Sequence, residues 1–264
     1  MASIIFWNCR GARKKEASLY LRQIVKDNKG FFVGLTETKM SSLDRNDINQ
    51  IIGNDWDYFH HPSIGISGGI LVMWKKEIAS FEVMDHSSQM IMGNLSVNAL
   101  GKWKIATVYG GKDAHTRKSL WQQLESCMIG DDPGIIVGDF NCILSKEDKK
   151  GGKRFHLSSG YKDMKMFLVN NDFHDIGFVG PSYTLCNNKE GTSRIWERLD
   201  RCLLNSATLQ NIPMAKDILQ LQIEETSEGS IMAEKLKALR CKVHDLNVTL
   251  KRPSTWWNHR AKIR

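Results

Sequence analysis

The chain has 264 residues, of which 41% are hydrophobic and 25% are charged, and its formal net charge is +8. These proportions are ordinary for a globular protein, and without an apolar run of about 18 residues we expect no segment that spans a membrane. No basic region precedes the apolar residues of the N-terminus, and the six cysteines form no Cys-x-x-Cys pair. We therefore expect an intracellular protein with reduced thiols, in the nucleus or the cytoplasm.

The basic excess belongs to the last part of the chain. Between Lys235 and Arg264 there are nine Lys or Arg residues and one acid, Asp245, which accounts for the whole net charge of +8. A segment of this sign favours nucleic acid or another polyanion as a partner. A solvated helix face is the commoner meaning of such a run.

Short apolar runs alternate with helical patterns along the first 205 residues. Strands are predicted at 3–7, 31–35, 67–74, 81–84, 90–97, 103–109, 133–142, 183–185 and 195–204, and helices at 16–26, 117–128 and 161–169. The three strands between 81 and 109 are typical of an antiparallel meander. Strands interleaved with a few helices predict an α+β fold, in which helices cover two packed sheets.

Polar side chains stand at the ends of four predicted strands. One strand ends on Asp139 and Asn141, and others end at Asn8, at Glu37 and at Tyr109, which precedes two glycines. A single polar strand end is more often a turn or a cap, and for the Asp139 and Asn141 end the two interpretations have equal weight. Strand ends at one edge of a sandwich converge, so that four together favour a site. Oxygen ligands suit Mg²⁺ rather than zinc, and Mg²⁺ commonly acts on phosphates.

The pattern changes after Asn205. Apolar residues then recur at spacings of four and three, as in a heptad repeat: Met232, Leu236, Leu239, Val243, Leu246 and Leu250. This repeat predicts a helix that could associate with a second copy, and Pro253 ends it. We divide the chain into a domain at 1–210 and a basic helical tail at 211–264.

Seven motifs occur in an order found in a known family. They are Asn8-Cys-Arg-Gly11, Leu35-Thr-Glu-Thr-Lys39, Gly68-Gly-Ile-Leu71, Val108-Tyr-Gly110, Gly138-Asp-Phe-Asn141, Gly180-Pro-Ser-Tyr-Thr184 and Glu197-Arg-Leu-Asp-Arg201. In these motifs the chain resembles the endonuclease/exonuclease/phosphatase (DNase I-like) family across about residues 1–205, and most of all the apurinic-type endonuclease domain of plant non-LTR (LINE) retrotransposons. The resemblance implies a four-layer α/β sandwich of two mostly antiparallel sheets flanked by helices. It also implies nicking of DNA with Mg²⁺, or alternatively Mn²⁺.

The resemblance gives a role to each polar strand end. Glu37 would be the principal metal ligand, with Asn8 beside it. Asp139 would align or deprotonate the attacking water, and Asn141 would donate a hydrogen bond to the reacting group.

Two further roles have structural alternatives. The resemblance implies that Tyr109 contacts the phosphate and that Asp200 orients a catalytic histidine, with the segment at 180–184 near the nucleic acid. Tyr109 could instead be a core aromatic residue, and Asp200 could pair with Arg198 or Arg201.

One motif of the family is missing. The family's last strand leads to Ser-Asp-His, whose Asp helps at the metal and whose His contacts the scissile phosphate, and this sequence contains no Ser-Asp-His. The segment around His259 resembles the linker that precedes the reverse transcriptase in the same elements. We expect a sandwich without its C-terminal strand, with an exposed sheet edge and weak or absent activity, because losing a general acid or base costs about 10²–10⁴ in rate. The alternative is a catalytically inactive remnant that binds nucleic acid or a partner through the basic heptad helix.

Overall fold

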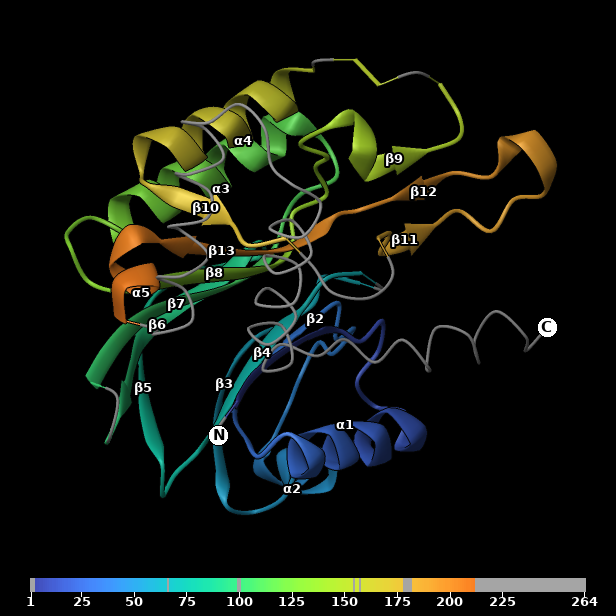
Figure 1. Cartoon of the computed structure of the whole chain (residues 1–264). Helices are drawn as coiled ribbons and strands as arrows, with labels where there is room; N and C mark the ends of the chain where they lie inside the picture. The colour runs from blue at the N-terminus through green and yellow to red at the C-terminus, as the bar shows by residue number, and fades with distance from the viewer. Residues whose placement is uncertain are drawn as a thin grey trace, which may run out of the picture.

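The computed structural model describes residues 3–65, 67–98, 101–153, 155–156, 158–177 and 182–211. In these residues two β-sheets lie face to face, with helices on the outer face of each (Figure 1). No helix in this part of the chain is long and apolar enough to cross a membrane. The heptad repeat, His259, Gly180 and Pro181 lie outside the described residues, as does all of the predicted tail except Asn211.

The first sheet contains the first four strands. Its order is β1 (Ser3–Asn8), β2 (Gly30–Thr36), β4 (Ile70–Lys75) and β3 (Trp56–His61). β1 runs parallel to β2, and the other two pairs are antiparallel. Its outer face is covered by α1 (Lys15–Asp27) and α2 (Arg45–Ile51), which lie at the bottom of Figure 1.

The second sheet contains six strands. Its order is β10 (Phe173–Asp175), β13 (Asp200–Asn205), β8 (Gly134–Asp139), β7 (Gly101–Tyr109), β6 (Met90–Val97) and β5 (Ala79–Ser87). Only the β7–β8 pair is parallel. The outer face is covered by α3 (Ala114–Cys127) and α4 (Ser159–Asn170), and α5 (Ser206–Asn211) follows β13.

A third, small sheet lies at one end of the sandwich (Figure 1). It consists of β11 (Leu185–Cys186), β12 (Trp196–Glu197) and β9 (Lys149–Lys150). Two single-turn 3₁₀ helices, η1 (Lys146–Asp148) and η2 (Gly191–Ser193), stand before β9 and before β12.

Three apolar clusters hold the layers together. The cluster between the sheets takes Phe32 and Val72 from the first sheet and Ile91 and Ile135 from the second, all buried. The other two clusters fill the spaces beneath the two pairs of helices. This is the four-layer sandwich of mostly antiparallel sheets that the sequence predicts, and that prediction is confirmed.

The predicted strand boundaries differ from the structure in several places, for example where the strand predicted at 133–142 ends at Asp139 and the strand predicted at 81–84 spans Ala79–Ser87. The predicted strand at 195–204 is two strands, because the chain leaves β12 and enters β13 at Asp200. The predicted strand at 183–185 begins only at Leu185. β4 begins at Ile70, since Gly68 and Gly69 both have positive φ and lie outside the sheet.

Gly138 permits the close approach of β7 and β8. Its φ is +151°, and a Cβ there would lie 1.9 Å from the carbonyl oxygen of Val108. We predict that Gly138→Ala lowers the free energy of unfolding by about 3 kcal/mol or more, because overpacking adds to backbone strain. Gly101→Ala is the matched control: its φ is +79°, and no atom lies within 4 Å of the added Cβ. Urea unfolding should show a loss of about 1 kcal/mol for the control, and equal losses would contradict the prediction.

Candidate active site

Three of the predicted residues lie in one row across the second sheet. Tyr109 pairs with Asp139 between β7 and β8, and Asp139 pairs with Asp200 between β8 and β13. Paired residues of neighbouring strands project to the same face of a sheet. This face is the one that packs against the first sheet, because Val137, two residues before Asp139, and Cys202, two residues after Asp200, belong to the cluster between the sheets.

Asn8 joins this row from the first sheet. It is the last residue of β1, and its Nδ2 donates a hydrogen bond of 3.1 Å to Oδ2 of Asp139. The other carboxylate oxygen of Asp139 accepts from the backbone N–H of Asn141 at 2.9 Å. Asp139 is 7% exposed, so this contact between the sheets is nearly closed to solvent.

Glu37 lies on a turn that the two glycines preceding strand β4 hold in place. Its φ is +56°, in the left-handed region that few non-glycine residues adopt. The next two residues, Thr38 and Lys39, donate backbone hydrogen bonds to Gly69 and Gly68 at 3.1 and 3.0 Å. A Cβ on Gly69 would lie 2.4 Å from Oγ1 of Thr38. The paired glycines therefore set the conformation that presents Glu37, and such strain is common at functional sites.

Two cations accompany Glu37. Nε of Arg10 and Nζ of Lys39 each lie 3.7 Å from one of its carboxylate oxygens. The Glu37 side chain is 19% exposed, compared with 28% for Arg10 and 41% for Lys39. The site thus combines buried acceptors with more exposed positive charges at its rim.

The hydroxyl of Tyr109 lies in the electrostatic field of both carboxylates. Burial, together with the negative charges of Glu37 and Asp139, raises the pKa of Tyr109 to about 12, although Arg10 acts in the opposite direction. The hydroxyl therefore keeps its proton at neutral pH and can donate it in a hydrogen bond. Tyr109 also packs against the cluster between the sheets, so the core and the site interpretations both describe it.

Gln89 supports the turn after Tyr109, and the sequence did not reveal it. Its backbone oxygen accepts from Tyr109 N at 2.8 Å, and its Oε1 accepts from Gly111 N at 2.6 Å. Between these two residues, the carbonyl of Gly110 accepts from Nδ2 of Asn141 at 2.7 Å. Gln89 is 6% exposed. Its buried side chain therefore fixes the turn after Tyr109, the turn that Asn141 also contacts.

Thr184 anchors the start of β13. Its Oγ1 accepts from the backbone N–H groups of Leu199 and Asp200 at 3.0 and 3.3 Å. Its own N–H donates to the carbonyl of Glu197 at 2.9 Å. Thr184, the last residue of the Gly180–Thr184 motif, therefore fixes the backbone that carries Asp200.

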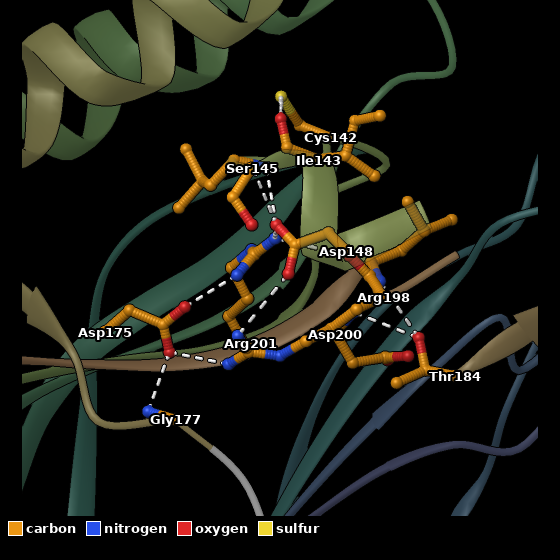
Figure 2. A network of polar contacts seen from close by, with 12 residues as sticks. Cys142, Ile143, Ser145, Asp148, Asp175, Gly177, Thr184, Arg198, Asp200 and Arg201 are labelled. Carbon is orange, nitrogen blue, oxygen red and sulfur yellow. Dashed lines mark hydrogen bonds and ion pairs between the residues drawn. The ribbon is translucent and has the colours of Figure 1, made fainter. Parts of the chain in front are cut away.

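A network of buried charges lies behind Asp200 (Figure 2). Arg201 donates to Asp148 and, at 2.6 Å, to Oδ2 of Asp175, while Arg198 donates to Oδ1 of Asp175 at 2.7 Å and lies 3.6 Å from Asp148. The Arg201 and Asp148 side chains are only 1% and 6% exposed. Successive residues of a strand point to opposite faces, so Arg201 lies on the other face of β13 from Asp200. The sequence motif contains both arginines, but Asp148 and Asp175 are too distant along the chain to be found from spacing.

The oxygen atoms of the site fit a hard cation. Oδ1 of Asn8 is buried and has no hydrogen-bond partner among the described residues, and such an acceptor can be satisfied by a metal ion. An amide oxygen, as in Asn8, and a carboxylate, as in Glu37, are donor types that Mg²⁺ prefers. In the described ranges no three His, Cys, Asp or Glu residues group as a metal site. Mg²⁺ needs fewer, because it usually keeps several waters and takes one or two carboxylates.

A comparison with protein families matches residues 5–215 to the endonuclease/exonuclease/phosphatase family. The match covers most of the chain, and the chain belongs to this family. No protein with a curated description matches the sequence.

Several solved structures share the fold. An AP endonuclease from Leishmania major has a TM-score of 0.60 and 17% identity, and the alignment covers 76% of this chain and 78% of that one. The endonuclease domain of TRAS1, a telomere-specific non-LTR retrotransposon, has a TM-score of 0.57 and 14% identity, with 78% and 86% covered. An AP endonuclease from Archaeoglobus fulgidus has a TM-score of 0.57 and 15% identity, with 82% and 89% covered. At these identities the likeness establishes the fold alone.

The charge of Glu37 should be visible in the titration of Tyr109. We predict that Glu37→Gln lowers the pKa of Tyr109, because removal of a nearby negative charge favours the phenolate. The measurement is the absorbance of tyrosinate against pH, with Tyr109→Phe used to isolate this residue. Glu82→Gln, at an exposed position of β5, is the control and should leave the titration unchanged. An unchanged pKa in Glu37→Gln would show that the two side chains do not interact.

The buried charge network should contribute strongly to stability. We predict that Arg201→Met lowers the free energy of unfolding by about 3–5 kcal/mol, because Asp148 and Asp175 lose a buried partner. Adding Asp148→Asn should reduce the loss below the sum of the single effects, as expected for residues in one network. Arg194→Met is the exposed control and should change stability little. Additive losses, measured by urea unfolding, would exclude the coupling.

Proposed function

We propose that this protein is a Mg²⁺-dependent phosphodiesterase that nicks DNA, of the type found in LINE retrotransposons, and that its activity is weak. The family and the similar solved structures, which are AP endonucleases and a retrotransposon endonuclease domain, support nuclease action on DNA. The observation that carries the proposal is the hydrogen bond of 3.1 Å between Asn8 and Asp139, which joins the polar ends of the two sheets. The sequence motifs support a plant LINE origin.

The chain's own residues supply most of the proposed chemistry. Glu37 and Oδ1 of Asn8 would hold Mg²⁺ or Mn²⁺, which when bound polarises a phosphoryl oxygen. Asp139, oriented by Asn8 and by the backbone of Asn141, would align the attacking water. The protonated hydroxyl of Tyr109 would donate to a phosphate oxygen.

The rim supplies attraction for the DNA backbone. Arg10 and Lys39 are the more exposed partners of Glu37, so part of their charge faces solvent. Positive side chains at a cleft rim neutralise phosphates and make binding dependent on salt.

The proposed weakness rests on the missing Ser-Asp-His motif. Asp200 lies in the same row of the second sheet as Tyr109 and Asp139, and in the family it would orient the histidine of that motif. Loss of a general acid or base reduces rates by about 10²–10⁴.

A second candidate is a catalytically inactive remnant that binds nucleic acid, or a partner chain, through the basic heptad segment. The charge distribution favours it, because residues 235–264 carry the entire net charge. Deletion of residues 231–264 should then weaken DNA affinity, and unchanged affinity would exclude this role.

We predict that the purified protein slowly nicks supercoiled plasmid in Mg²⁺, and that Glu37→Ala and Asp139→Ala both abolish nicking. Removal of the metal ligand or of the water-aligning group leaves the phosphodiester without activation. Gel conversion of supercoiled to open-circular DNA is the measurement, and Glu82→Ala is the control, expected to nick at the unmodified rate. If the unmodified protein binds DNA and never nicks it, the remnant interpretation replaces the proposed activity. Nicking that survives both substitutions would place the active site elsewhere.

A further inference from the structure

Two histidines face each other across the edge strands of the two sheets. His61 is the last residue of β3, and His86 lies near the end of β5. Their Nδ1 atoms are 3.1 Å apart, and their ring centroids are 5.3 Å apart. The ring of Phe59 lies 5.0 Å from that of His86, so an aromatic side chain of β3 supports the pair.

The strand registers place this pair at the same end of the sandwich as the candidate active site. Across the first sheet, Asn8 pairs with Thr36, Thr36 with Ile70 and Ile70 with His61. Neighbouring strands lie about 4.8 Å apart, so three steps put His61 about 14 Å from Asn8. The two positions are therefore distinct.

The second sheet brings His86 to the matching position. His86 pairs with Ile91 and Ile91 pairs with Thr107, two residues before Tyr109 on β7. Ile91 and Ile70 both belong to the cluster between the sheets. Both imidazoles thus project from the inner faces of the sheets, where the sandwich opens at its edge.

We propose that His61 and His86 together bind a divalent transition-metal ion of the Zn²⁺, Cu²⁺ and Ni²⁺ class. Two imidazole nitrogens that each lie about 2.0–2.1 Å from a zinc ion, at a separation of 3.1 Å, subtend an angle of roughly 100° at the metal. This angle lies between the octahedral and the tetrahedral values. His86 is exposed and His61 is half-buried, so rotation of the His86 ring can bring both lone pairs to one ion.

The tautomers of the two rings bear on metal binding. Neutral imidazole is the form of histidine that ligates metals. In the pair as it stands, one Nδ1 donates a hydrogen bond to the other. When both Nδ1 atoms ligate an ion, the donor ring carries its proton on Nε2 instead, so each ring stays neutral.

Ligand chemistry separates this position from the Glu37 site. Imidazole nitrogen favours zinc, copper and nickel, whereas carboxylate and amide oxygens favour magnesium. The nearest carboxylate in sequence, that of Asp85, accepts from the backbone N–H of His86 at 2.7 Å. The remaining coordination positions would be filled by water. Because the ligands come from different sheets, the ion would link β3 to β5.

Calorimetric titration of the full chain with Zn²⁺ tests the proposal. The unmodified protein should bind one more Zn²⁺ ion than His61→Gln and His86→Gln do, or should bind that ion at least about tenfold more tightly. Changes outside the ligand shell already weaken metal affinity by about 10–100-fold, and loss of a ligand should have at least this effect. His174→Gln is the matched control: His174 is half-buried and on a strand, as His61 is, but it contacts Asp172 and Ser206. It should bind Zn²⁺ as the unmodified protein does. Circular dichroism confirms that each variant is folded.

A second measurement uses the unmodified protein alone. Electron paramagnetic resonance of one equivalent of Cu²⁺ should show coupling to two equivalent imidazole nitrogens, and this signal should be lost in His61→Gln. Zinc should also raise the melting temperature of the unmodified protein more than that of either variant, because an ion bound only by the folded state stabilises it. Zinc binding and copper spectra identical in His61→Gln, His86→Gln and His174→Gln would overturn the proposal. The outcome does not depend on nicking activity, since every readout is metal binding.

Discussion

The pairing register of three neighbouring strands sets the geometry on which the candidate site depends. Tyr109, Asp139 and Asp200 project to one face because they occupy the same row of β7, β8 and β13. A slip of one residue would turn a strand's side chains to the opposite face and remove its member of the row. Gly138, which lies against the carbonyl of Val108, and Thr184, which binds the backbone at Asp200, both fix the strands near this row.

The contact between the sheets completes the arrangement. The bond from Asn8 to Asp139 is a polar link between the sheets at the end of an otherwise apolar cluster. In a setting of low dielectric constant, a hydrogen bond is stronger than in water, and an unmatched polar group is costly. Oδ1 of Asn8 is such an unmatched group in the described structure, which makes it the natural contact for a cation.

Local patterns predicted the strand ends and the sandwich well. Asp139 and Asn141 follow an apolar run directly, and the same is true of Glu37, so an ordinary polarity pattern identifies them. What the sequence could not give was contact between distant segments. Gln89 reaches the turn after Tyr109, and Asp148 reaches Arg201, 53 residues away, only through the tertiary fold. The short helix α2 had a local signal, a capping box of Asp44 and Asp47, which apolar periodicity alone overlooks.

The place of β13 in the second sheet has a consequence for how the protein is made. β13 is inserted between β8 and β10, both of which precede it in the chain. During synthesis from the N-terminus, β8 therefore leaves the ribosome with one side unpaired. More than 60 further residues must be made before Asp200 can pair with Asp139. Pairings between residues this far apart form slowly, and exposed strand sides favour aggregation in the interval. The row of Tyr109, Asp139 and Asp200 thus assembles in two stages, with Tyr109 and Asp139 joined first and Asp200 added only when the last described strand arrives.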